Sequence, residues 1–219
     1  MKKRGFLLAV CTVGVMLSGC GSRETAFSPS ESCVYVAKDG ALSSALVEQT
    51  GGISVDENEL KQYLETAVIH FNEEKGAGAL AQNQKNAERL PAALKSVKAG
   101  KDTVTAIFDY ASFEDLKAFG ETNDNEDTSN SLTALEAKPL SEAIADGWFS
   151  EGELVKADGS EAGTDTVQNE KSGMAVRSEG GATLMVGGKV LHRSSNTELK
   201  DDSTVSLPET GTAYVIFKR

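Results

Sequence analysis

The sequence is poor in the residues that most enzymes and metalloproteins use for their chemistry. Its 219 residues include two histidines, three cysteines, one tryptophan and four prolines. Two histidines are too few to predict a metal site, and no Gly-x-Ser-x-Gly nucleophile elbow is present. A serine–histidine–acid triad stays open, because its members need not be close in the sequence. The sequence therefore predicts no catalytic residue, no cofactor and no metal.

Positive charge is also scarce. The chain has 22 lysines and arginines against 33 acidic residues, which gives a formal net charge of −11. The field of such a chain repels nucleic acid, teichoic acids and anionic lipid headgroups, so these are poor candidates as partners, and no nucleic acid is expected. Paired carboxylates for glycoside hydrolysis cannot be picked out among so many acidic residues. The charge is better explained as keeping the protein soluble.

Long apolar runs are absent except near the N-terminus, where a targeting signal is recognisable. Three basic residues at positions 2–4 precede an apolar segment at residues 5–16, and Leu17-Ser18-Gly19-Cys20 follows. A secretory signal peptide has this order of positive charge, apolar core and small residues. The cysteine at its end makes the segment resemble a bacterial lipoprotein signal. That resemblance implies a diacylglyceryl group on Cys20 and removal of residues 1–19.

A transmembrane anchor and an ordinary secretory signal are the two alternatives for this segment. A transmembrane anchor needs about 20 apolar residues, and only twelve precede Leu17. If the segment were an ordinary secretory signal, Cys20 would have no role. The order Leu, Ser, Gly and Cys would then have arisen by chance. Two acyl chains anchor a protein stably, whereas one chain binds marginally. The lipoprotein signal thus predicts a protein anchored through Cys20 to the extracytoplasmic face of the cell membrane.

The mature chain would begin at Cys20, with 200 residues and a formal net charge of −14, because three positive charges leave with the signal. Residues 20–32 are small and polar and predict a flexible tether. Residues 33–219 are expected to form a single domain. Cys33 is the only thiol left in that domain, so no internal disulfide is expected. It is predicted to be a small buried residue, with an intermolecular disulfide as the alternative.

A β-hairpin and a long helix are predicted at the start of the domain. Strand-forming residues flank Asp39-Gly40, a strong hairpin signal because glycine accepts the positive φ of the turn. A helix at residues 55–74 follows, opened by a capping box of Ser54 and Glu57. His70 is placed at the margin of its buried stripe. That stripe has helical spacing and consists of Leu60, Tyr63, Leu64, Ala67, Val68 and Phe71.

The order of hairpin and helix is then repeated. Residues 76–90 predict a mobile connection, a second hairpin is expected at residues 94–110, and a short helix at residues 112–119. The repetition hints at two ββα units, residues 33–75 and 94–119.

Residues 121–131 predict an exposed acidic loop. Asn123, Asn125 and Asp127 alternate as in a calcium-binding loop. However, Thr128 and Ala134 stand where such a loop needs glycine and glutamate. A solvated loop is the better interpretation.

The C-terminal part is predicted to consist mainly of strands and turns. A short helix at residues 141–146 and a strand at residues 153–157 come first. Residues 174–219 predict short antiparallel strands, with Gly180-Gly181 and Gly187-Gly188 as hairpin turns. The predicted fold class is α+β, with antiparallel β-hairpins packed on one long amphipathic helix and a short second helix, followed by C-terminal antiparallel strands.

Leu207-Pro208-Glu209-Thr210-Gly211 matches the pentapeptide that sortases cut between threonine and glycine. Sortase substrates continue with a long apolar segment, whereas eight residues follow Gly211 here. Eight residues are far short of a membrane span. Because proline fixes φ and glycine suits a turn, the motif predicts a link between two strands.

Trp148 and Phe149 form the one candidate ligand platform. Their rings could stack on a sugar or a peptide. A lone tryptophan after Asp146-Gly147 is more often an anchor of the hydrophobic core. The sequence leaves both roles open.

Three stretches are similar to uncharacterised lipoproteins of anaerobic gut Firmicutes. They are residues 34–40, 109–115 and 213–218, and the resemblance covers roughly residues 33–120 and 174–217. It implies a location and a fold, because no activity is attached to that family.

The predicted function is that of a non-enzymatic binding or interaction module of the cell envelope. It rests on the lipoprotein signal at Cys20 and on the lack of a catalytic motif. The expected partners are the membrane, through the lipid, and an unidentified envelope protein or ligand. The alternative is a small envelope hydrolase whose site is assembled from scattered residues. A solute-binding subunit is less favoured, because the chain lacks the alternating strands and helices of a two-lobed α/β protein.

Overall fold

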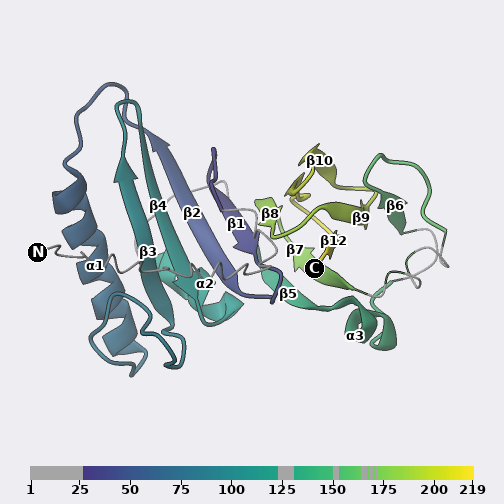
Figure 1. Cartoon of the computed structure of the whole chain (residues 1–219), viewed down its shortest axis with the longest axis horizontal. Coiled ribbons are helices and arrows are strands. Elements are labelled where there is room, and N and C mark those ends of the chain that lie inside the picture. Colours follow the sequence, from purple (N-terminus) through teal and green to yellow (C-terminus); the bar gives the residue numbers. More distant parts are fainter. Residues whose placement is uncertain (1–26, 123–130, 150–152, 164–166, 168–169, 171) are drawn as a thin grey trace, which may run out of the picture.

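The structure is a computed structural model that describes residues 27–122, 131–149, 153–163, 167, 170 and 172–219. These residues form three helices and two β-sheets (Figure 1), so the predicted α+β class is confirmed. None of the described helices is long and apolar enough to cross a bilayer. The signal at residues 1–19, Cys20 and residues 123–130 of the predicted acidic loop lie outside the described part.

The larger sheet has seven strands and contains both predicted hairpins. Their spatial order is β10 (Glu198–Asp201), β11 (Thr204–Ser206), β8 (Thr183–Val186), β1 (Cys33–Val36), β2 (Leu42–Gln49), β4 (Thr103–Tyr110) and β3 (Ala92–Ala99). The turn between β1 and β2 contains Gly40 at φ +85°. The strands β1 and β8 run parallel, a pairing that the sequence does not predict.

The smaller sheet has five strands, all of them antiparallel to their neighbours. Their order is β5 (Ala134–Pro139), β7 (Gly173–Glu179), β12 (Thr212–Lys218), β9 (Val190–Ser194) and β6 (Leu154–Lys156). The short helix α3 (Leu140–Ala145) contacts β5 and β7. The sequence predicts neither β5 here nor β10 in the larger sheet.

The two glycine pairs connect different sheets, so their prediction as hairpin turns is wrong. β7 and β9 belong to the five-stranded sheet, whereas β8 between them belongs to the seven-stranded sheet. A Cβ atom at Gly188 would overlap the carbonyl oxygen of Lys218, and one at Gly180 would overlap the carbonyl oxygen of Ser131. Glycine is therefore needed where the chain passes close to its neighbours.

One hydrophobic core joins the two sheets. Phe108 and Leu184 of the larger sheet pack in the same cluster as Val215 and Phe217 of the smaller sheet. The link at residues 207–211 also crosses between sheets, from β11 to β12. Leu207 is buried there, and its N–H donates to the carbonyl of Ala182 at 2.8 Å. Because β12 is paired on both sides, the C-terminal strand is an inner strand.

The long helix α1 (Glu57–Glu74) begins at a different cap from the predicted one. The carboxylate of Asp56, rather than the hydroxyl of Ser54, accepts the N–H groups of Asn58 and Glu59 at 2.8 and 3.0 Å. Such a cap satisfies N–H groups that have no partner within the helix. Glu57 instead accepts the N–H of Ala99 at the end of β3, at 2.9 Å.

The buried stripe of α1 is narrower than the sequence predicts. Val68, Phe71 and Asn72 are buried, whereas Tyr63 is 70% exposed. Figure 1 shows α1 running beside β3, the edge strand of the larger sheet, and α1 makes extensive contact with that strand. A helix at an edge presents fewer residues to the core than one lying across a face, so Tyr63 stays in solvent.

Asn72 fixes the connection at residues 76–90, which contains no helix or strand. Its side-chain amide donates to the carbonyls of Leu80 and Ala92, both at 2.8 Å, and its oxygen accepts the N–H of Ala92 at 3.0 Å. These bonds satisfy a fully buried side chain. They also cover part of the free edge of β3.

The second helix, α2 (Phe113–Thr122), begins where the Ser112 hydroxyl accepts the N–H of Asp115 at 3.1 Å. Leu116 and Phe119 are buried, and Phe119 meets Phe71 of α1 in an edge-to-face contact. The element order of the two predicted ββα units is present, but the helices are placed differently. α1 follows the edge of β3, whereas α2 contacts β2, β3, β4 and β5.

Candidate binding groove

The two faces of the hairpin strands differ in character. β2 and β4 are registered so that Ser43 lies opposite Asp109, and Ser44 lies opposite Phe108. Successive side chains of a strand point to opposite faces. Phe108 and Tyr110 belong to the shared core. Ser43 and Asp109 therefore occupy the other face, which we call the outer face of the seven-stranded sheet.

A groove of about 620 Å³ lies on this outer face. Its polar wall is formed by the turn of the first hairpin, the strands β2, β3 and β4, and the segment that leads into β3. The side chains that give the groove its charge and its hydroxyl groups are Ser28, Tyr35, Asp39, Ser43, Arg89, Lys95, Ser96, Lys98, Thr105 and Asp109.

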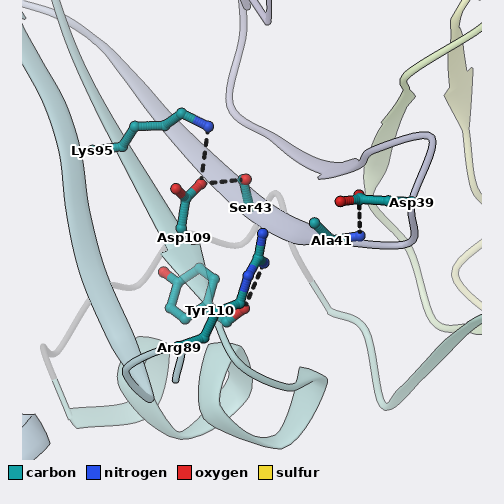
Figure 2. A network of polar contacts seen from close by, with 7 residues as sticks. All are labelled: Asp39, Ala41, Ser43, Arg89, Lys95, Asp109 and Tyr110. Atoms are coloured by element: carbon teal, nitrogen blue, oxygen red, sulfur yellow. Dashed lines mark hydrogen bonds and ion pairs between the residues drawn. The ribbon is translucent and has the colours of Figure 1, made fainter. Parts of the chain in front are cut away.

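Asp109 is the centre of the polar network in this groove (Figure 2). One of its oxygens, Oδ1, accepts the Ser43 hydroxyl at 2.6 Å and the Lys95 ammonium at 3.2 Å. β3 has a bulge between Leu94 and Ser96, so Lys95 has no partner in the strand ladder. A bulge changes the direction of a side chain. Here the bulge lies at Lys95, whose ammonium group reaches the carboxylate of Asp109 on the neighbouring strand β4.

Two further charged residues frame the network. Arg89 donates through Nη1 to the carbonyl of Tyr110 at 3.4 Å, and Asp39 accepts the N–H of Ala41 at 3.0 Å (Figure 2). With Lys98, which is exposed, the groove holds three cations and two anions. Its charge is thus positive, although the whole chain has a formal charge of −11.

The N-terminal wall of the groove comes from the segment predicted to be a flexible tether. The ring of Phe27 stacks on Tyr35 with 4.3 Å between centroids. The Ser32 hydroxyl accepts the N–H of Val47 at 2.9 Å, and Glu31 pairs with Lys200 at 2.8 Å. The tether prediction is therefore wrong for residues 27–32, because they are held against the sheet. Residues 20–26 lie outside the described part.

The side chains of the groove are suited to binding a ligand, and none of them is arranged as a catalytic nucleophile. Ser43 is 3% exposed and donates its proton to a carboxylate, whereas catalytic serines commonly have an imidazole base. Neither histidine lines the groove. His70 is exposed beside Glu74 on α1, and His192 is buried in β9. No group of three or more His, Cys, Asp or Glu side chains in the described ranges could hold a metal ion.

Cys33 is a buried residue at the first position of β1, as the sequence predicts. Burial raises the pKa of its thiol to about 12, with a further contribution from Glu31. The thiol therefore stays protonated, and a protonated thiol is a poor nucleophile.

Trp148 and Phe149 lie away from the groove. Trp148 is 8% exposed and packs with Leu140, Leu154 and Ile216 against the five-stranded sheet. The Lys138 ammonium lies 4.5 Å from the centroid of its ring. This placement favours the core-anchor role for Trp148. Phe149 is half-buried and meets Tyr214 edge to face.

Sequence reasoning did not identify the groove. The available signal was the alternation of β4, in which Thr105, Ile107 and Asp109 face away from the core. Which residues lie across from Asp109 depends on strand register and on the bulge at Lys95, and neither can be derived from local patterns. Comparison with known proteins gives no relative, because no protein family, curated protein or solved structure matches the chain.

Proposed function

We propose that this chain is a lipid-anchored protein of the cell envelope that binds a polar ligand or partner through the outer-face groove. The groove's mixed charges and hydroxyl groups are the observation that carries the binding role. Polar groups that converge in a concave surface fix the orientation of a ligand. The lipoprotein signal at Cys20 supports the location.

The position of Phe27 supports a connection between anchor and groove. Phe27 lines the groove and lies seven residues after Cys20. A fully extended chain spans at most about 3.6 Å per residue, so the groove would be held within roughly 25 Å of the lipid. A ligand in the envelope close to the membrane would be within its reach.

The proposed scaffold of this groove is the arrangement expected from the sequence, in which the hairpins pack on the long helix and on the short second helix. Contacts of α1 with β3 and burial of Phe71 and Leu116 in the common core support it. The resemblance to lipoproteins of anaerobic gut Firmicutes is part of the same proposal, and it adds location and fold but no activity.

The lipid anchor is tested by mass spectrometry of the N-terminal peptide of the native protein, together with a Cys20→Ala variant. We expect a diacylglyceryl-modified Cys20 as the first residue, and release of the Cys20→Ala variant from the membrane. An intact Met1, or unchanged membrane retention of the variant, would refute the anchor.

The groove is tested by sedimentation of the full-length protein with isolated envelope fragments from the producing cells. A Lys95→Glu/Lys98→Glu variant reverses two groove charges, and Lys61→Glu/Lys75→Glu makes the same charge change on α1 and at its C-cap. We expect the groove variant to lose at least about tenfold in affinity, since close charge pairs in interfaces contribute several kcal/mol. Equal binding by both variants would refute the groove as the binding surface.

A further inference from the structure

The inner face of the same strands contains a second site. A pocket of about 360 Å³ lies between β1, β2, β4, α2, residues 131–133 before β5, and Ala182 and Thr183 at the start of β8. Most of its wall is apolar, formed by Val34, Leu46, Phe108, Leu116, Phe119 and Leu132. It is a different site from the groove, because Ser44 and Tyr110 line it while their neighbours Ser43 and Asp109 line the groove.

Two hydroxyl groups form a hydrogen-bonded pair in this pocket. The other polar side chains that line it are Ser32, Lys117, Glu121, Ser131, Thr133 and Thr183. The Ser44 and Tyr110 hydroxyl oxygens are 3.0 Å apart, and either can donate to the other. A shared hydrogen bond uses one of their two protons, so the other proton can be donated to a third atom. Tyr110 is 3% exposed. Burial raises the pKa of its hydroxyl, and the pair therefore stays protonated.

The size of the pocket suits a small organic molecule. An apolar cavity of about 150 Å³ stays dry and binds benzene in another protein, and protein interiors otherwise leave few such spaces. The pocket here has more than twice that volume. Lys117, Gly120 and Glu121 line it and are exposed, so it opens beside α2.

We propose that this pocket binds a small, uncharged, mainly apolar molecule that carries one oxygen acceptor. The apolar wall takes the body of the molecule, and the Ser44–Tyr110 pair donates a hydrogen bond to its oxygen. A charged ligand is excluded from the depth of the pocket, because an ion there would lose its hydration without an opposite charge nearby. Lys117 and Glu121 are at its exposed end.

The test uses two probes of the same shape. Acetophenone has a carbonyl oxygen, and α-methylstyrene has a methylene group at the same place. Methyl NMR of the full-length protein follows the signals of Leu46 and Leu116 during titration. We expect acetophenone to shift both signals to saturation, and α-methylstyrene to bind about three- to tenfold more weakly because it accepts no hydrogen bond.

A variant series assigns the hydroxyl pair. Ser44→Ala/Tyr110→Phe is expected to reduce the affinity for acetophenone about three- to tenfold and to leave that for α-methylstyrene unchanged. Tyr214→Phe is the matched control, because it removes a hydroxyl from the other sheet. A circular dichroism melt checks that each variant is folded. The proposal is overturned if acetophenone gives no saturable shift in the wild type, or if the double variant binds both probes as the wild type does.

Discussion

The outer faces of the two sheets differ in what covers them. The five-stranded sheet covers that face with α3 and a hydrophobic cluster that includes Trp148 and Ile216. The seven-stranded sheet leaves Ser43, Lys95 and Asp109 on its outer face, where they line a groove. The five-stranded sheet closes its outer face with aromatic residues, whereas the seven-stranded sheet presents charges and hydroxyl groups beside a small apolar cluster that includes Phe27 and Ile107. The proposed binding groove thus lies on one half of the molecule.

The shared core allows this division. Both sheets contribute their inner faces to it, and the chain crosses between them repeatedly after β7. The seven-stranded sheet is therefore stabilised mainly by the packing of its inner face in this core. Its outer face carries a small apolar cluster around Ala45 and Ile107 and, beside it, the polar residues of the groove, which add little to stability there.

The largest expected effect is on the inner face of α1. Phe71→Ala should lower the free energy of unfolding by about 3–5 kcal/mol, because Phe71 is 3% exposed and packs on Phe119. Tyr63→Ala on the same helix should change it by less than about 0.5 kcal/mol, because Tyr63 is 70% exposed. Urea unfolding measures both, and similar effects from the two variants would contradict the position of α1.

Trp148→Ala should lower the free energy of unfolding by a similar amount, about 3–5 kcal/mol. At a temperature where the variant is folded, its binding to envelope fragments should be unchanged. The reason is that Trp148 is 8% exposed in the cluster on the five-stranded sheet. Urea unfolding and sedimentation give the two values. Loss of binding without loss of stability would indicate that Trp148 contacts the ligand, and would contradict the difference proposed between the two sheets.

Acid should destabilise the five-stranded sheet through His192. Burial lowers the pKa of His192, Lys156 lowers it further and Glu170 opposes the shift, so the folded state keeps the imidazole neutral. The unfolded chain gains a proton as the pH falls below about 6.5. His192 thus contributes full stability above that pH, and stability is lost as the pH falls towards the lowered pKa of the folded state.

The measurement is urea unfolding of wild type, His192→Gln and His70→Gln at pH 7.5 and pH 5.5. We expect the wild type and His70→Gln to lose stability at the lower pH, and His192→Gln to lose less. His70 is the control because its side chain is 73% exposed on α1. An equal loss in all three proteins would show that another group governs the acid sensitivity.

The smallest expected effect belongs to the groove. Ser43→Ala removes one hydrogen bond to Asp109, which still pairs with Lys95 at 3.2 Å. The cost should be about 1 kcal/mol, measured by urea unfolding. A loss above about 3 kcal/mol would indicate that the network serves the fold rather than a ligand.

Local signals in the sequence predict the elements that depend on local chemistry. Asp39-Gly40 marks the first hairpin, because a glycine with positive φ is required there. The strand β5 escapes prediction, because the alanines, leucine and glutamate of Ala134–Pro139 have no strand preference of their own. Its strand conformation comes from pairing with β7, a contact between residues far apart in the sequence.

The errors have a common physical origin. The two glycine pairs look like hairpin turns in the sequence because a turn between strands does not reveal which sheet each strand joins. The helical spacing includes Tyr63 in the buried stripe because the width of contact depends on whether α1 meets a face or an edge. The groove depends on the register of β2, β4 and the bulged β3, so its residues become visible only in the fold.

The central claim is that the outer face of the seven-stranded sheet, and not the five-stranded sheet, meets the ligand or partner in the envelope. Photo-crosslinking in the producing cells tests it most directly, with the crosslinking residue placed at Lys98 or at Lys156 of the full-length chain. Both are exposed lysines on edge strands, one in each sheet. We expect a discrete adduct from position 98 and none from position 156. Adducts from position 156 alone, or equal adducts from both, would contradict it.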